Sequence, residues 1–296
     1  MSSTICKVPL TTLNSGTLMP LIGLGTFKIR GKDVIYRCIE SALQAGYRSF
    51  DTASVYRNEA DIGECLKELL PKYKLQRSDV FITSKLGPAE QGKDKCKKAC
   101  LRSIQKLQCG YLDLYLIHWP GTQGKKPEDS VNKDLRLQSW NDMIELHKEG
   151  KLKSIGVSNF LQHHIADIIE QSGVTPAVLQ IEHHPHLVQH DLLNFCKEKG
   201  IHFQAYSSLG TSTDDNKLLA DVRVKDVAKS YGKTEAQILL KWAVQQNIGV
   251  LPKSTNPEHI RDNIDIFDFN LSSEDMNILN KMDTQFHYCW NPESIT

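Results

Sequence analysis

Short apolar segments alternate with longer amphipathic segments along almost the whole chain. The apolar segments are too short for typical helices, and they are rich in Ile, Val, Leu, Tyr and Phe. This composition is typical of strands that are buried on both faces of a parallel sheet. The pattern predicts eight strands, at 21–25, 47–51, 79–85, 111–118, 152–159, 177–182, 201–207 and 248–254.

Amphipathic helices of about 10–15 residues are predicted between these strands. The clearest examples are 33–46 and 94–110, and several such segments end on glycine, the residue that is favoured just after a helix. An open, doubly wound sheet also alternates in this way, but it rarely needs eight strand–helix units. We therefore expect an α/β fold with a closed (β/α)8 TIM barrel.

A β-hairpin is predicted before the barrel. Two short β-prone stretches flank Asn14, Ser15 and Gly16, residue types that tolerate positive φ in turns. No low-complexity linker interrupts the sequence after this hairpin. The chain is therefore expected to form one domain over residues 1–296.

Composition and charge exclude several classes of protein. Hydrophobic residues make up 40% and charged residues 24% of the 296 residues, as in an ordinary globular chain. The 36 Lys and Arg against 35 Asp and Glu leave a net charge of +1, which disfavours nucleic-acid or anionic-membrane partners. No signal peptide, long apolar span or Cys-x-x-Cys pair is present. We expect a cytoplasmic monomer.

Polar residues occupy the predicted C-terminal ends of the strands, where the active sites of (β/α)8 barrels lie. Lys85 closes a buried strand and therefore needs a counter-charge. Asp51, on the neighbouring strand, is the candidate, and Tyr56 and His118 flank the pair. The other strand-end residues are Trp119, Ser158, Asn159, Gln180, Glu182, Tyr206, Ser207, Lys253 and Ser254.

An Asp–Lys pair beside a tyrosine suits the reduction of a carbonyl group. The nearby ammonium favours the phenolate and is expected to lower the pKa of Tyr56, which then protonates the carbonyl oxygen as hydride arrives. A neutral His118 can donate a hydrogen bond to the same oxygen and fix its orientation. The group offers no obvious nucleophile for acyl transfer.

The chain resembles the aldo-keto reductase family over nearly its whole length. The segments GYRSFDTASVYRNE (46–59), LDLYLIHWP (112–120), IGVSNF (155–160) and LPKSTNPEHIRDN (251–263) occur in that family's order and spacing. The resemblance implies an NADP-dependent oxidoreductase that reduces aldehydes and ketones to alcohols. It also implies that the catalytic residues are the four that the strand ends suggest: Asp51, Tyr56, Lys85 and His118.

The same resemblance assigns residues to a bound NADPH. It implies that Tyr206 stacks on the nicotinamide ring and that Ser158, Asn159 and Gln180 hold the carboxamide. Thr26 and Asp51 would lie near the ribose, and Ser207 and Leu209 near the pyrophosphate. The 2′-phosphate would be held by Lys253, Ser254 and Thr255, and the adenine would lie near Asn263.

His259 departs from the pattern of the family, which usually has an arginine at this position. Arg261 lies two residues further on, and on a helix it points elsewhere. The resemblance therefore implies a weaker hold on the 2′-phosphate, and NADH could also be used with a weaker preference.

A substrate pocket for small or extended carbonyl compounds is expected, with walls at Phe27, Val55, His118, Trp119 and Trp290. Trp290 could equally anchor the tail against the barrel. Gly87 is expected to open the pocket on one side. The loop at 120–134 is moderate in length, and the loop at 210–215 is short.

Two other functions stay open. The stretch EHHPHLVQH (182–190) suggests a metal-dependent barrel hydrolase, but such barrels need a His-x-His pair on the first strand, and 21–25 has no ligand. We therefore expect no metal. A non-catalytic dinucleotide-binding protein, structural or channel-associated, is the other alternative. The complete set of four catalytic residue types disfavours it.

Overall fold

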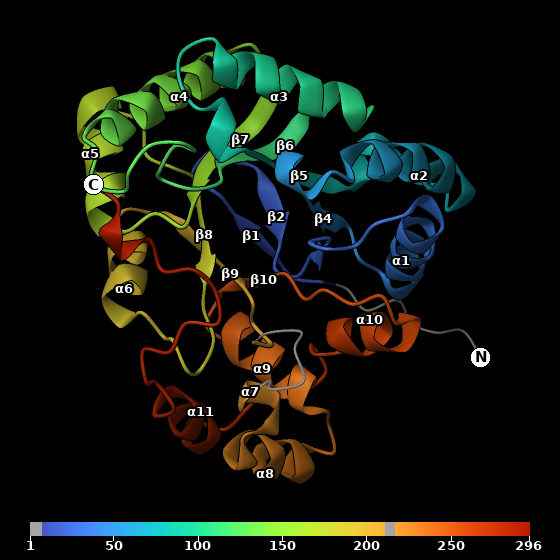
Figure 1. Cartoon of the computed structure of the whole chain (residues 1–296). Helices are drawn as coiled ribbons and strands as arrows, with labels where there is room; N and C mark the ends of the chain where they lie inside the picture. Colours follow the sequence, from blue (N-terminus) through green and yellow to red (C-terminus); the bar gives the residue numbers. More distant parts are fainter. Residues whose placement is uncertain (1–7, 211–216) are drawn as a thin grey trace.

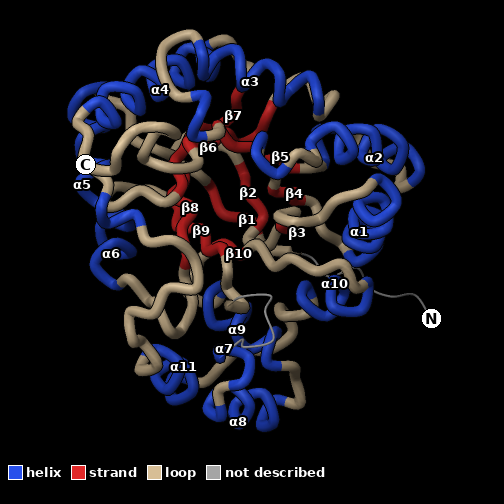
Figure 2. Tube along the Cα trace, in the orientation of Figure 1, coloured by secondary structure: helices blue, strands red, loops and turns tan. Residues whose placement is uncertain are grey.

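The computed structural model describes residues 8–210 and 217–296, and these contain an eight-stranded parallel sheet that is surrounded by helices (Figures 1 and 2). The strands follow one another around the sheet in sequence order. Each one falls within or overlaps a predicted apolar segment. They are β3 (Leu24–Gly25), β4 (Ser49–Asp51), β5 (Phe81–Leu86), β6 (Leu112–Ile117), β7 (Leu152–Ser158), β8 (Val178–Glu182), β9 (His202–Tyr206) and β10 (Gly249–Val250).

Backbone hydrogen bonds close the sheet into a barrel. The N–H of Gly23 donates to the carbonyl of Val250 (3.0 Å), and the N–H of Val250 donates to the carbonyl of Leu21 (2.8 Å). Glycine allows the two strands to approach this closely, since a Cβ on Gly25 would lie 2.8 Å from the carbonyl oxygen of Leu251. The predicted (β/α)8 barrel is therefore confirmed.

The predicted hairpin is also present. Strands β1 (Leu10–Thr12) and β2 (Leu18–Pro20) pair in antiparallel fashion. Leu13, directly after β1, and Met19, in β2, are buried. They pack in one apolar cluster with Phe81 at the start of β5 and Val178 at the start of β8. The hairpin therefore covers the N-terminal end of the barrel and leaves the opposite end open for a site.

Helices surround the sheet in both views. The predicted segment 33–46 forms α1, which ends where Gly46 (φ 104°) donates its N–H to two carbonyls of the last turn. The segment 94–110 forms a shorter helix, α3. The helices are α1 (Lys32–Ala45), α2 (Glu59–Lys72), α3 (Lys95–Lys106), α4 (Val131–Lys148), α5 (Gln162–Ser172), α6 (His190–Glu198), α7 (Lys217–Ala220), α8 (Val222–Tyr231), α9 (Glu235–Val244), α10 (Pro257–Ile264) and α11 (Ser273–Asn280).

The loops and the chain end complete the mouth of the barrel. The loop after β6 ends where α4 begins at Val131, close to the predicted limit. The loop expected at 210–215 lies almost entirely outside the described residues. After α11, the C-terminal residues run past α6 to the chain end beside α5 (Figure 1). In the described ranges, no helix combines the length and the apolar character needed to cross a membrane.

Buried histidines are expected to make the fold sensitive to acid. The ring of His183 lies between Trp242 (4.9 Å between centroids) and Phe203 (5.2 Å), and burial lowers its pKa to about 3. The unfolded chain takes up this proton near pH 6.5, so stability should fall below that pH by up to about 1.4 kcal/mol per pH unit.

The variant His183→Phe should reduce this slope in urea unfolding between pH 7.5 and pH 5. Phe195→Leu, a buried apolar change on α6 that removes no titratable group, is the matched control and should leave the slope unchanged. An unchanged slope in His183→Phe would contradict the assignment.

Candidate active site

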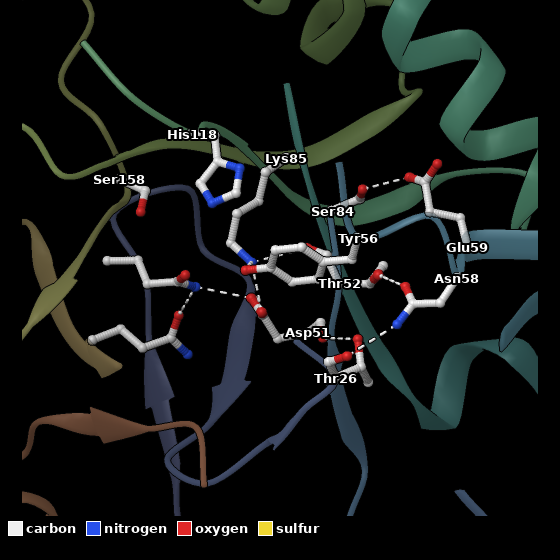
Figure 3. Close-up of polar contacts among 12 residues, drawn as sticks. Thr26, Asp51, Thr52, Tyr56, Asn58, Glu59, Ser84, Lys85, His118 and Ser158 are labelled. Atoms are coloured by element: carbon white, nitrogen blue, oxygen red, sulfur yellow. Dashed lines mark hydrogen bonds and ion pairs between the residues drawn. The ribbon is translucent and has the colours of Figure 1, made fainter. Parts of the chain in front are cut away.

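Four polar side chains meet at the C-terminal edge of three neighbouring strands (Figure 3). Asp51 is the last residue of β4, Lys85 lies in β5, and His118 directly follows β6. Tyr56 ends the short 3-10 helix η1 (Ser54–Tyr56), which follows β4. Because the three strands pair in parallel, their C-terminal ends lie at one edge. The structure thus brings together the four residues predicted from the strand ends.

Lys85 and Asp51 form the expected ion pair, with 2.5 Å between Nζ and Oδ1. The Lys85 side chain is 0% exposed, and its ammonium also donates to the carbonyl oxygen of Thr52 (2.9 Å). Burial acts to lower the pKa of Lys85, but the charge of Asp51 and the contacts with Tyr56 together outweigh it and hold this pKa above its ordinary value. The lysine is therefore a charged group inside the barrel.

Tyr56 lies against this pair, with its hydroxyl 3.4 Å from the Lys85 ammonium. Burial raises the pKa of Tyr56 above 10, while the charge of Lys85 acts in the opposite direction. The expectation that the pKa of Tyr56 falls is therefore wrong for the protein by itself. The ammonium has the predicted effect, but the loss of water around the ring outweighs it.

His118 packs edge-on against Tyr56, with 5.7 Å between the ring centroids. Burial, and then the nearby Lys85 charge, hold the pKa of His118 well below its ordinary value of 6.5. The imidazole is therefore neutral, as predicted, and it carries a single N–H donor. Its Nδ1 atom is buried without a hydrogen-bond partner among the described residues.

Asn159 connects the catalytic candidates to the residues assigned to the nicotinamide. Its amide donates to the carbonyl oxygen of His118 (2.9 Å) and to the hydroxyl of Ser158 (3.1 Å). Its amide oxygen accepts a hydrogen bond from the hydroxyl of Tyr206 (2.5 Å). Asn159 has φ 61°, a left-handed backbone that is uncommon outside glycine and is often found at functional sites.

Gln180 belongs to a second group of hydrogen bonds at the site, which includes the ion pair. Its amide nitrogen donates both to Oδ2 of Asp51 (2.9 Å) and to the amide oxygen of Gln204 (2.9 Å). Gln180, which is predicted to hold the carboxamide, is therefore in direct contact with the predicted ion pair. Gln204, which is buried in β9, was missed by the strand-end argument because it does not end its strand.

Asn58 is a second residue that the sequence argument missed. Its amide donates to the carbonyl oxygens of Thr26 (3.0 Å) and Ile29 (3.1 Å), and its oxygen accepts from the hydroxyl of Thr52 (2.6 Å). The hydroxyl of Thr26 donates in turn to the carbonyl of Asp51 (2.8 Å). Figure 3 shows this group beside the ion pair. In the sequence, the adjacent polar residues Asn58 and Glu59 at the start of α2 were the signal that pointed to this group of contacts.

The residues assigned to the outer part of the cofactor lie on the loops after β9 and β10 and on α10. Ser207 and Leu209 follow β9, and both are half-buried. Around the start of α10, exposed or half-exposed side chains surround the positive end of the helix, an arrangement that fits a phosphate group. Those assigned here are Lys253, Ser254, Thr255 and His259, while Asn263 on the same helix is buried.

Apolar side chains surround the mouth. Phe27 is 53% exposed, Val55 46% and Trp290 55%, so each offers apolar surface at the mouth. Phe27 contacts the ring of Tyr56 (5.1 Å between centroids), and Trp119 contacts Trp290 (4.7 Å). The predicted wall residues therefore gather around the candidate acid.

Gly87 does not open the pocket as expected. A Cβ on this residue would meet the hydroxyl oxygen of Ser54 and a methyl group of Val55, both at 3.1 Å. The glycine therefore allows the loop after β5 to pack closely on η1, and no free space lies on its Cβ side.

The histidine-rich stretch has a structural use. His184 contacts the carboxylate of Glu182 through Nε2 (2.9 Å), and Nδ1 of His186 lies 3.0 Å from the hydroxyl of Tyr288. No group of three or more His, Cys, Asp or Glu within residues 8–210 and 217–296 could hold a metal ion. The structure therefore offers no support for the hydrolase alternative.

Comparison with known proteins identifies the family. The model of the Aldo/keto reductase family matches residues 21–284, which is most of the chain. The chain belongs to the aldo-keto reductase family. It is 41% identical to aldo-keto reductase family 1 member A1 of Xenopus tropicalis, over 94% of this chain and 89% of the relative. It is 36% identical to a glyoxal reductase of Bacillus subtilis, over 96% of both chains.

A solved structure supports the same conclusion. The crystal structure of an aldo/keto reductase from Brucella melitensis is similar, with a TM-score of 0.84 and 39% sequence identity. The match covers 94% of this chain and 100% of that one. As a member of the aldo-keto reductases, the protein is an oxidoreductase of a family that uses nicotinamide cofactors.

Removal of the buried lysine should cost stability as well as activity. Lys85→Met leaves Asp51 buried without its cation, and such a loss typically costs about 3–5 kcal/mol. Adding Asp51→Asn should recover much of the stability but none of the activity. Urea unfolding and turnover assays measure the two effects.

Lys97→Met is the matched control, because Lys97 forms a partly exposed ion pair with Glu149 (2.7 Å). Loss of such a pair costs about 1 kcal/mol or less. Equal stability changes in the two lysine variants would contradict the role of the buried pair.

Proposed function

We propose that this aldo-keto reductase reduces aldehydes and ketones to alcohols with NADPH, with Tyr56 as the general acid. The observation that carries the proposal is the contact of the Tyr56 hydroxyl with a buried ammonium (3.4 Å) inside a ring of exposed apolar side chains. When bound, NADPH supplies the hydride that is transferred to the carbonyl carbon. We further propose one domain over residues 1–296, a cytoplasmic monomer and a small-molecule carbonyl as the substrate.

Tyr56 supplies the proton. Because burial raises the pKa of Tyr56, its phenol is fully protonated at neutral pH and can donate to the carbonyl oxygen. The phenolate that remains is stabilised by the Lys85 ammonium, which Asp51 keeps charged. The ion pair thus acts mainly on the product of the proton transfer, where a negative charge appears.

His118 orients the substrate. A neutral imidazole can donate one hydrogen bond to the carbonyl oxygen without competing as an acid. The buried position of His118 and the positive charge of Lys85 both keep it neutral. Its main-chain carbonyl accepts a hydrogen bond from Asn159, and its ring packs edge-on against Tyr56.

The side chains of this site suit a nicotinamide dinucleotide. Tyr206 would lie along the ring face, and Ser158, Asn159 and Gln180 would hold the carboxamide. Thr26 and Asp51 would lie near the ribose. Ser207 and Leu209 would follow the pyrophosphate, Lys253, Ser254, Thr255 and His259 the 2′-phosphate, and Asn263 the adenine.

The substrate pocket is proposed to be open, with walls at Phe27, Val55, His118, Trp119 and Trp290. A screen of aldehydes, α-dicarbonyl compounds and ketones with saturating NADPH tests the activity and defines the substrate class. Binding of NADPH without turnover of any of these compounds would favour a non-catalytic dinucleotide-binding protein instead.

Loss of the Tyr56 hydroxyl should abolish most of the turnover. Tyr56→Phe should lose about 10²–10⁴ in kcat, the usual effect of a positioned proton donor. The affinity for NADPH should barely change, because the hydroxyl acts mainly in the transition state. Tyr36→Phe, on α1, is the control and should keep its turnover. A Tyr56→Phe variant with nearly unchanged kcat would exclude Tyr56 as the acid.

His259 should limit the preference for NADPH. Arginine keeps its charge at every working pH, whereas a histidine side chain loses its charge in the neutral range. His259→Arg should therefore bind NADPH more tightly than the wild type, with a larger difference at pH 8 than at pH 6.5. Binding of NADH should be similar in both proteins.

Fluorescence titration of both proteins with both cofactors at the two pH values measures this effect. The control variant Arg261→His changes an exposed residue of the same helix. Parallel pH dependence in wild type and His259→Arg would show that His259 does not contact the phosphate.

A further inference from the structure

Glu182 is a buried carboxylate at the mouth of the barrel that the mechanism above does not use. It ends β8 and is 2% exposed. Its Oε1 accepts hydrogen bonds from the main-chain N–H of Tyr288 (2.7 Å) and from Nε2 of His184 (2.9 Å), and its Oε2 accepts from the N–H of Cys289 (3.1 Å). These donors lower the pKa of Glu182 although burial opposes them, so the group carries a full charge.

Two of the three donors belong to the C-terminal segment (residues 283–293), which follows α11. His186 adds further attachments to the same segment. Its carbonyl oxygen accepts from the N–H groups of Thr284 (3.2 Å) and Phe286 (3.0 Å), and its ring contacts the hydroxyl of Tyr288 (3.0 Å). The histidine-rich stretch after β8 is thus the part of the barrel to which the C-terminal segment is attached.

The attached segment reaches both parts of the candidate site. Sγ of Cys289 lies 3.3 Å from the hydroxyl of Ser207, in the loop assigned to the cofactor. The ring of Trp290 lies against Trp119, whose ring is next to His118 (6.3 Å between centroids). Trp290 is therefore both a tail residue and a wall residue, and the two interpretations of its role are compatible.

Hydrogen bonds and ring contacts together hold this part of the segment: the ring of Tyr288 also packs on His184 (5.0 Å between centroids), and Pro292 is buried. A cavity of about 50 Å³ lies beneath it, lined by Glu182, Tyr206, His287 and Trp290 among others. Trp290 itself is more than half exposed. On the N-terminal side of Trp290, the backbone is attached to the carboxylate of Glu182 through the N–H groups of Tyr288 and Cys289, and hydrogen bonds to a charged acceptor are stronger than neutral ones.

We propose that Glu182 is a positioning residue for substrate selectivity: it fixes the C-terminal segment so that Trp290 forms part of the substrate wall. Glu182 touches neither the substrate nor the reacting atoms, and it acts through Trp290. The proposal rests on the carbonyl reduction proposed above. It predicts an effect on the binding of large substrates that a merely stabilising residue would not have.

Glu182→Gln tests the proposal with little change in shape. One end of the amide still accepts a hydrogen bond, but the other end is an NH2 group that faces an N–H of the segment. The KM for 2-naphthaldehyde should rise roughly 3- to 10-fold, the range that the loss of one aromatic contact covers. The KM for propanal and both kcat values should stay within about 2-fold, because Tyr56, Lys85 and His118 are untouched.

A double-mutant cycle decides whether Glu182 acts through Trp290. Trp290→Ala should produce the same loss of selectivity, and Glu182→Gln combined with Trp290→Ala should produce no further loss. Additive losses in the double variant would overturn the proposal. Gln189→Met is the matched control, because Gln189 donates to the main-chain carbonyl of Glu182 (2.6 Å) and not to its carboxylate. This variant should keep the wild-type selectivity.

Tryptophan fluorescence gives a readout that needs no turnover. Acrylamide should quench Glu182→Gln more strongly than the wild type, and the difference should vanish when both proteins also carry Trp290→Phe. Equal quenching of folded Glu182→Gln and wild type would overturn the proposal. If Glu182→Gln does not fold, Glu182→Asp is used in every arm, because it keeps the charge but withdraws it from both N–H groups.

The two proposals fail in different ways. A wild type that reduces neither aldehyde would reject carbonyl reduction, while the quenching experiment would still report on the attachment of Trp290. A wild type that reduces both aldehydes, beside a folded Glu182→Gln with unchanged KM values, would reject only the role of Glu182.

Discussion

The buried ion pair between Lys85 and Asp51 is the interaction on which the rest of the site depends. Two charges inside a barrel are stable only when each finds further polar partners. Lys85 uses the carbonyl of Thr52 and the hydroxyl of Tyr56, and Asp51 uses the amide of Gln180. Tyr56 (the candidate acid), Gln180 (the candidate carboxamide ligand) and the strand ends are therefore positioned by the electrostatic needs of one pair.

The same pair separates the protonation states of its neighbours. Burial keeps the phenol of Tyr56 protonated, and burial together with the Lys85 charge keeps His118 neutral. One group is then a proton donor and the other an uncharged hydrogen-bond donor at the same pH. The buried ammonium of Lys85 affects both groups: it opposes a positive charge on His118 and stabilises a negative charge on Tyr56.

Glu182 is another buried carboxylate at the mouth, and its charge is stabilised in a different way from that of Asp51. Asp51 is neutralised by a lysine, whereas Glu182 is held by N–H groups and a histidine. The difference matters because N–H groups belong to a backbone. The charge of Glu182 therefore fixes a segment of chain that lies more than 100 residues away in the sequence, and with it part of the pocket wall.

The sequence by itself determined the barrel, the hairpin and the four residues at the strand ends, because these follow from local periodicity and from the rule that sites lie at the C-terminal ends of strands. Only the tertiary structure decided the pKa of Tyr56, since burial of a ring depends on residues far along the chain. It also decided the packing of Gly87 and the contacts of Asn58, Gln204 and Glu182. Asn58, Gln204 and Glu182 are polar and buried, and most of their partners come from other parts of the chain, so no local pattern reveals these contacts.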